Sequence, residues 1–182
     1  MREFVLMAAN AGRPDIRDVT RERFDMIARC VNAAFWLSNG IRNDVRIHIY
    51  LGKMGKVVSF SSSIKRVSPD ERSIVLWIDK VLKGIRNPGI DAVDISFEDF
   101  LKGMKNRHVY LLLEEGKDME KAEIKADPVF VIGDHKGLED DYLEILKKYC
   151  PGTISLGRLS YLSSHCISFL NMWLDRKSVT GK

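Results

Sequence analysis

The chain has 182 residues, of which 45% are hydrophobic and 30% are charged, and its formal net charge is +4. This balance is typical of a folded globular protein and excludes disordered, collagen-like and coiled-coil chains. The length suits one domain with a substantial core and is too short for two ordinary ones, so we expect a single domain over residues 1–182. The mildly basic charge is compatible with an RNA partner but does not require one.

The cysteines and the N-terminal segment indicate the cellular setting. Cys30, Cys150 and Cys166 are odd in number and widely spaced, which favours neither a disulfide framework nor a metal half-site. The apolar run at residues 4–9 is too short for a signal peptide or for a membrane span. We therefore expect a protein of the reduced cytoplasm with no membrane segment, and we interpret residues 4–9 as a buried strand.

Helix and strand patterns alternate in the first part of the chain. Apolar residues at helical spacing predict a helix over residues 20–38, and Asn39-Gly40 is a plausible stop for it. Alternating apolar residues then predict a strand at residues 45–51, and a shorter strand is expected at residues 57–60.

A second helix is expected to begin at a capping sequence. Ser68 is interpreted as the N-cap, Pro69 as the first helical residue and Glu71 as the residue that completes a capping box. This helix is expected to run to about Gly84.

The same alternation continues to the C-terminus. Residues 116–125 are highly charged and are expected to be exposed. The last helix is expected to bury a stripe formed by Leu162, Cys166, Trp173 and either Phe169 or Leu170. The patterns predict strands at residues 92–95, 109–113, 128–133 and 153–156, and helices at residues 97–104, 138–149 and 160–175. Strands that alternate with helices predict an α/β fold with a mainly parallel sheet flanked by helices.

Common enzyme motifs are missing from the sequence. There is no GxGxxG after the first strand, no GxxxxGK[ST] and no paired histidine spacing, so a dinucleotide site, a P-loop and a metal site are not indicated. Two glycine-bearing turns remain, at residues 131–138 and 154–161, each between a predicted strand and a predicted helix. Ordinary connecting turns and a ligand site at the carboxyl ends of the strands are both compatible with this spacing.

The residues around these turns resemble a known family. Gly133-Asp134-His135, then Ile154-Ser155-Leu156-Gly157, then Ser160-Tyr161-Leu162-Ser163-Ser164-His165-Cys166 are similar to the second and third motifs of the SPOUT methyltransferases, in the form found in archaeal tRNA pseudouridine N1-methyltransferases. The resemblance extends over nearly the whole chain. There are two departures: Glu22-Arg23-Phe24-Asp25 replaces the usual Gly-Arg-Leu-Asp, and Arg158 replaces a proline.

The resemblance implies a fold and a cofactor site. The fold would be a SPOUT-type α/β domain whose C-terminal segment forms a deep trefoil knot. The cofactor would be S-adenosyl-L-methionine, bound at the two glycine turns, with Leu162 as a further apolar wall. The residues implied in binding are Leu112, Gly133, Leu156, Gly157, Arg158, Leu159, Ser160, Tyr161 and Cys166.

The resemblance also implies a reaction and partners. The enzyme would methylate N1 of pseudouridine at position 54, in the T-loop of tRNA, as a homodimer whose interface includes the last helix. The N1 proton must leave, so a carboxylate and cations are needed near the base, and the candidates are Asp25, Arg23 and Arg42. A surface ion pair between Asp25 and Arg29, four residues apart on one helix, is the competing interpretation of that carboxylate.

Three other functions remain open at this point. A related enzyme could methylate pseudouridine in ribosomal RNA, a non-catalytic RNA-binding or assembly protein could keep the same fold, and a plain α/β domain could bind another small ligand. Binding of S-adenosyl-L-methionine would disfavour the second of these.

Overall fold

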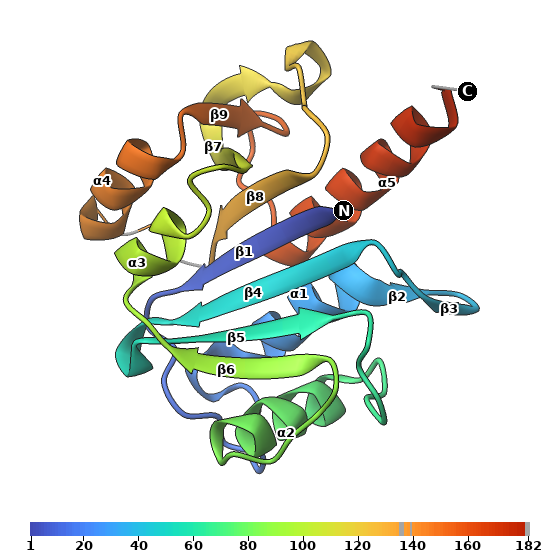
Figure 1. Cartoon of the computed structure of the whole chain (residues 1–182), viewed down its shortest axis with the longest axis vertical. Helices are drawn as coiled ribbons and strands as arrows, with labels where there is room; N and C mark the ends of the chain where they lie inside the picture. Colours follow the sequence, from blue (N-terminus) through green and yellow to red (C-terminus); the bar gives the residue numbers. More distant parts are fainter. Residues whose placement is uncertain (135–136, 139, 181–182) are drawn as a thin grey trace.

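The computed structural model describes residues 1–134, 137–138 and 140–180. Its centre is a seven-stranded sheet with the strand order β6-β5-β4-β1-β8-β7-β9 (Figure 1). The strands are β1 (Arg2–Ala8), β4 (Val45–Leu51), β5 (Lys56–Ser61), β6 (Ile90–Asp94), β7 (His108–Asp118), β8 (Pro128–Gly133) and β9 (Gly152–Ser155). Neighbouring strands pair in parallel in the part of the sheet ordered β4-β1-β8-β7-β9. Strand β5 pairs antiparallel with both β4 and β6. The mainly parallel sheet expected from the sequence is confirmed.

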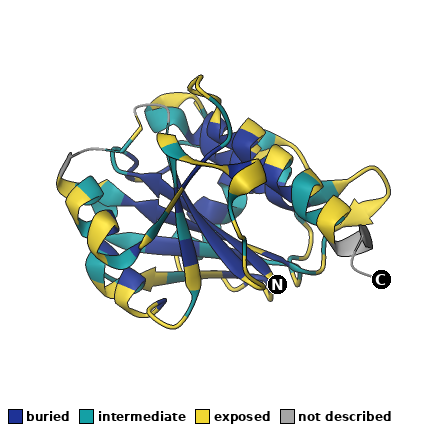
Figure 2. Cartoon of the chain, turned by 90° about the horizontal axis from the view of Figure 1, so that it is seen from above, coloured by how far each residue is buried: buried dark blue, intermediate teal, exposed yellow. Residues whose placement is uncertain are grey.

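Helices cover both faces of this sheet. The helices are α1 (Phe24–Phe35), α2 (Glu71–Leu82), α3 (Phe97–Lys102), α4 (Asp140–Tyr149) and α5 (Ser163–Thr180), with short 3-10 turns η1 (Arg21–Arg23), η2 (Gly52–Met54) and η3 (Met119–Lys121). Phe4 and Leu6 of β1 belong to the apolar cluster with α1, α2 and α5, whereas Val5 and Met7 belong to the cluster with α3 and α4. The sheet is therefore a buried layer between two helical layers, as Figure 2 shows.

Helix α1 is shorter than the sequence pattern predicts. It begins only at Phe24, because Glu22 and Arg23 adopt left-handed backbone angles with φ of 51° and 60°. It ends at Phe35, because the following residues form a hairpin of β2 (Trp36–Leu37) and β3 (Gly40–Ile41). Asn39-Gly40 therefore belongs to the hairpin and does not end the helix.

Glu22 occupies the position where the resembling family has glycine. A left-handed conformation costs a residue other than glycine about 1–2 kcal/mol. The Glu22 carboxylate accepts a hydrogen bond from the Gly12 backbone N–H and pairs with Lys53 at 2.8 Å, and these contacts hold the residue in place. Glu22 therefore allows the same left-handed turn before α1 that glycine would allow, but its own backbone is strained there.

The N-cap of α2 is Asp70 and not Ser68. The Asp70 carboxylate accepts a hydrogen bond from the Ser73 N–H at 2.8 Å, while the Ser68 N–H donates to the Ser73 hydroxyl at 2.9 Å. Both residues are compatible with an N-cap, and only the path of the chain into the helix decides between them.

The buried side of α5 agrees in part with the expected stripe. Cys166 and Leu170 are buried as predicted, together with Ile167 and Asn171, whereas Phe169 is 39% exposed and Leu162 is 47% exposed. Helix α5 begins at Ser163, so Leu162 precedes it and does not extend its apolar face.

A buried polar network links three strands beneath α3. Glu3 of β1 lies 3.1 Å from His48 of β4, whose other ring nitrogen lies 2.8 Å from the hydroxyl of Ser59 on β5. Arg107 donates a hydrogen bond to the second Glu3 oxygen at 2.8 Å. Burial by itself would raise the pKa of Glu3, but the hydrogen bonds and charges of His48 and Arg107 outweigh it and lower that pKa to about 2.

This network predicts a specific loss of stability in acid. The pKa of Glu3 is lower in the folded than in the unfolded protein, so its contribution is present above pH 4.5 and disappears as the pH falls toward 2. We expect Glu3→Gln to remove about 2 to 3 kcal/mol of unfolding free energy at neutral pH and to flatten its decline in acid. Urea unfolding between pH 7 and 2.5 measures this, with Asp94→Asn as the control, because Asp94 is exposed and pairs only with Lys56 among the described residues. Parallel acid profiles for Glu3→Gln and the parent would contradict the assignment.

Candidate functional site: a pocket at the carboxyl ends of three strands

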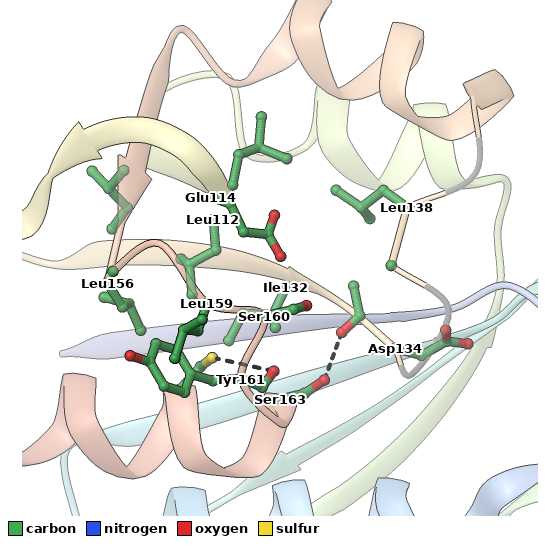
Figure 3. Close-up of a pocket in the computed structure, with 16 residues that line it drawn as sticks. Leu112, Glu114, Ile132, Asp134, Leu138, Leu156, Leu159, Ser160, Tyr161 and Ser163 are labelled. Carbon is green, nitrogen blue, oxygen red and sulfur yellow. Dashed lines mark hydrogen bonds between the residues drawn. The ribbon is translucent and has the colours of Figure 1, made fainter.

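A pocket lies where β7, β8 and β9 approach the beginning of α5 (Figure 3). The pocket has a cavity volume of about 120 Å³ and is open to solvent. The lining residues come from four segments of the chain: Leu112, Leu113 and Glu114; Ile132, Gly133, Asp134, Gly137 and Leu138; Ile154, Leu156 and Gly157; and Leu159, Ser160, Tyr161, Ser163 and Cys166.

Two glycines line this pocket at positions where neighbouring atoms leave little room for a side chain. A side chain on Gly133 would lie 2.7 Å from the Gly137 backbone, so the turn can close only without one. Gly157 has a φ of 149°, and a side chain there would lie 3.1 Å from the Tyr161 hydroxyl. Both positions present bare backbone to the cavity, as expected where a chain approaches a ligand closely.

Serine hydroxyls hold these turns in place. Ser163, at the start of α5, donates a hydrogen bond to the Gly133 carbonyl at 2.7 Å, which joins the helix to the end of β8. Ser155 donates to the Gly157 carbonyl at 2.9 Å and accepts from the Gly157 N–H at 3.2 Å. The two glycine turns are therefore fixed by contacts inside the fold and do not depend on a ligand for their shape.

Almost all of the residues implied in cofactor binding line this pocket. The exception is Arg158, which lies in a neighbouring hollow formed with Glu114, Glu115 and Gly116. Leu162, expected as an apolar wall, points outward, and His135 of the first motif lies outside the described residues. The lining residues not anticipated from the sequence are Leu113, Glu114, Ile132, Asp134, Gly137, Leu138, Ile154 and Ser163. Most of these residues lie inside or next to the motif segments. The sequence therefore pointed to the right segments, but not to these residues as part of the lining.

Cys166 forms one wall of the pocket as a neutral thiol. Burial raises its pKa to about 11, and the negative charge of Glu114 adds to that shift. Its Sγ also lies 4.0 Å from the Tyr161 carbonyl. A thiol protonated at neutral pH is a poor nucleophile, so the side chain serves as a wall.

Asp25 and Arg23 lie at the beginning of α1. The buried Asp25 carboxylate accepts hydrogen bonds from Arg23 at 3.1 and 3.3 Å and also from Arg29, which in turn pairs with Glu71 at 2.7 Å. The ion pair between Asp25 and Arg29 is therefore present, but Asp25 is buried and is not part of an exposed surface pair.

Helices α1 and α5 run in the same direction. Asp25, at the start of α1, therefore lies at the ends of the strands where the pocket is found. Cys30 of α1 and Cys166 of α5 are buried in the same apolar cluster. Further along, the Asn171 amide donates hydrogen bonds to the carbonyls of Ala33 and Ala34 at 3.0 and 3.2 Å. The first residues of both helices thus lie at the same edge.

Arg42 lies at the opposite edge of the sheet. It makes two hydrogen bonds to Asp175 of α5, at 2.8 and 2.7 Å, and Arg2 at the start of β1 joins the same carboxylate at 2.9 Å. Nine residues of helix, or roughly 13 Å, separate Asp175 from Cys166 in the pocket. Within one chain, the structure does not bring Arg42 together with Asp25 and Arg23.

Comparison with known proteins identifies the family. Residues 1–179 match a family of SAM-dependent RNA methyltransferases. The tRNA (pseudouridine(54)-N(1))-methyltransferase of Thermococcus kodakarensis is 39% identical, with 96% of this chain and 99% of the relative covered. The enzyme of the same name from Methanopyrus kandleri is 32% identical, with 97% and 94% covered. The chain belongs to this family of methyltransferases.

The fold of the methyltransferase agrees with a solved structure. The crystal structure of Archaeoglobus fulgidus Nep1 bound to S-adenosylhomocysteine has a TM-score of 0.66 to this chain at 16% identity, and it covers 96% of this chain and 97% of its own. A likeness at this level concerns the fold, and it confirms the SPOUT-type α/β architecture expected from the sequence.

The pocket suits the cofactor of this SAM-dependent family. Leu112, Leu138 and Leu156 offer apolar walls for an adenine ring. Gly133 and Gly157 allow the two turns to close around the pocket, because a side chain at either position would meet the Gly137 backbone or the Tyr161 hydroxyl. Among the described residues no cluster of histidine, cysteine and carboxylate side chains could hold a metal ion. No helix in the described part of the chain is long and apolar enough to cross a membrane.

Proposed function

We propose that this methyltransferase transfers a methyl group from S-adenosyl-L-methionine to N1 of pseudouridine 54 in the T-loop of tRNA. The observation that carries the proposal is the 39% identity, over nearly the full length of both chains, to a tRNA (pseudouridine(54)-N(1))-methyltransferase. The pocket between the irregular middle of β7 and the ends of β8 and β9 supports it as the cofactor site.

A basic segment beside the pocket edge supports a tRNA substrate. Arg13, Arg17 and Arg21 are exposed on the loop that leads from β1 into α1, and they border one shallow hollow whose lining also includes the acidic Asp15, Glu22 and Asp79. Exposed arginines bind phosphates of an RNA backbone and release its counterions. The loop lies at the same edge of the sheet as Asp25 and the cofactor pocket, so a bound RNA would meet both.

The chemistry needs a methyl donor, a positioned base and a route for one proton. The bound cofactor supplies a methyl group on a positively charged sulfur. Arg23 is half-exposed and aligned by Asp25, so it can stabilise the negative charge that develops on the uracil ring. Asp25 is the proposed acceptor or relay for the N1 proton. Arg42 keeps a proposed role only in the pocket of a second copy, because its own chain holds it at the far edge.

The direct test compares two tRNAs. The protein is incubated with S-adenosyl-L-methionine and with tRNA that carries either pseudouridine or uridine at position 54, and the methylated nucleoside is mapped by mass spectrometry. We expect N1-methylpseudouridine at position 54 only in the first tRNA. Methylation only of ribosomal RNA would favour the related rRNA enzyme, and cofactor binding without methylation of either RNA would favour an assembly protein.

A variant of Asp25 tests the proton route. We expect Asp25→Asn to lower the single-turnover rate at saturating tRNA by about 10²–10⁴-fold, because the amide cannot accept the N1 proton. Glu71→Gln is the matched control, since it removes the other carboxylate that pairs with Arg29. Binding of tRNA and cofactor is measured in parallel. An unchanged rate across a pH series would remove Asp25 from the mechanism, and a loss of tRNA affinity alone would make it a positioning residue.

We also propose that two copies associate through α5 and the loop before it. Large apolar side chains are exposed along this surface: Leu159, Tyr161, Leu162, Phe169 and Met172. Trp173 of the same helix is half-buried and donates a hydrogen bond to Glu120 at 3.1 Å. Because Leu159 and Tyr161 also line the pocket, a second copy on this surface would cover its mouth.

Sedimentation tests this interface. We expect the parent to be a dimer and Met172→Lys to raise the dissociation constant at least about tenfold, because a charge replaces a buried apolar contact. Ile85→Lys is the control, since Ile85 is also 50% exposed but follows α2. A monomeric parent, or an equal effect of both substitutions, would contradict the proposal.

We also propose a trefoil knot, a single domain over residues 1–182 and a cytoplasmic location. The knot is proposed from the resemblance of the segments at residues 133–135 and 154–166 to SPOUT motifs. Both apolar clusters share one sheet, which supports a single domain. All three cysteines are free, which supports a reducing compartment. A crystal structure with the cofactor tests the knot and the domain, and imaging of a tagged chain tests the location.

A further inference from the structure

One lining residue, Glu114, is an exposed carboxylate on an irregular part of β7. The pairing of β7 with β9 shifts between Leu112 and Lys117, so the residues between them leave the regular ladder. Gly116 returns the strand to β9, where a side chain would lie only 2.4 Å from the Ile154 backbone. Such bulges redirect side chains, and here the bulge presents Glu114 to the pocket.

The carboxylate of Glu114 points into the pocket. Figure 3 shows it in the space between Leu112, Ile132 and Leu138. Its charge reaches Cys166 on α5, since it contributes to the raised pKa of that thiol. In the described part of the chain, the Glu114 side chain makes no hydrogen bond or ion pair, although Arg158 borders the neighbouring hollow that Glu114 also lines.

The charges of the described lining have one sign. Glu114 and Asp134 are acidic, and no lysine or arginine is among the described lining residues. The methyl donor carries a positive sulfonium, and its demethylated product S-adenosylhomocysteine is a neutral thioether with otherwise the same groups. A carboxylate in the pocket therefore attracts the donor more strongly than the product.

We propose that Glu114 is the counter-charge to the sulfonium and makes the pocket selective for the methyl donor over S-adenosylhomocysteine. The inference rests on the proposed methyl transfer for its purpose. Once the methyl group leaves, the sulfur loses its charge and the attraction of Glu114 is lost with it, which favours exchange of product for fresh donor. Glu114 is a specificity-determining residue in this scheme and takes no proton from the base.

Calorimetry with three ligands tests the charge directly. The ligands are S-adenosyl-L-methionine, S-adenosylhomocysteine and an analogue in which an amine-bearing carbon replaces the sulfonium. We expect Glu114→Gln to weaken both charged ligands about tenfold and to change the affinity for S-adenosylhomocysteine by less than about twofold, a modest effect because the carboxylate is exposed. Glu115→Gln is the matched control: it removes the adjacent charge, which borders the neighbouring hollow and not the pocket.

Salt gives a second readout. The preference of the parent for the donor over the product should decline as ionic strength rises, and this decline should be absent in Glu114→Gln. Equal weakening of all three ligands would overturn the proposal, because Glu114 would then contact a group that they share. No effect on any ligand, or the same effect from Glu115→Gln, would overturn it as well.

The calorimetry and the tRNA methylation assay together separate this inference from the proposed function. A parent that binds the ligands with a Glu114-dependent preference but methylates no tRNA would contradict the tRNA proposal and leave the charge selectivity established. A parent that methylates tRNA without that preference would contradict only the role of Glu114. A parent that binds neither donor nor product would overturn both the selectivity and the placement of the cofactor.

Discussion

The parallel pairing of β1 with β8 is the constraint on which the site depends. Its register sets Met7 beside Gly133, so the loop that leaves β1 and the glycine turn that leaves β8 emerge at one edge of the sheet. Ser163 then fixes the start of α5 to Gly133, and the parallel packing of α5 on α1 brings the first residues of α1 to the same edge. The ligand pocket and the candidate catalytic residues are both consequences of this one register.

The sequence showed the strands and the motif segments, but not the contacts that shape them. The apolar runs at β1 and β8 are local features, and with the other strand and helix patterns they were sufficient to predict the sheet. The glycines at 133 and 157 were also compatible with ordinary turns, and the half of the pocket lining that was predicted came from the family resemblance of the motif segments. The left-handed Glu22, by contrast, is held by Gly12 and Lys53, which are distant in sequence. The bulge that presents Glu114 depends likewise on the approach of Gly116 to β9. Periodicity carries no information about such tertiary contacts.

Arg42 illustrates the limit of assigning a role from a motif alone. Sequence cannot tell which edge of a parallel sheet a loop residue occupies until the strands are placed. The structure puts Arg42 at the amino-terminal edge, where it and Arg2 share the carboxylate of Asp175. Removal of one member of such a partly buried cluster leaves an unbalanced charge, so a loss of activity in an Arg42 variant would not by itself show a catalytic role. Only a measurement that separates stability from rate can do so.

The two substrates of the proposed reaction have opposite charges, and each suits a different region of the protein surface. The tRNA is a polyanion, and the exposed arginines on the loop between β1 and α1 suit it. The methyl donor carries a positive sulfonium, and the described pocket lining is acidic. Glu114 would repel a phosphate that came close, so its position on the β7 bulge, on the side of β8 away from β1, keeps that charge apart from the basic loop. The strand order thus separates the two sites at the same end of the sheet, so that the charge of one does not weaken binding at the other.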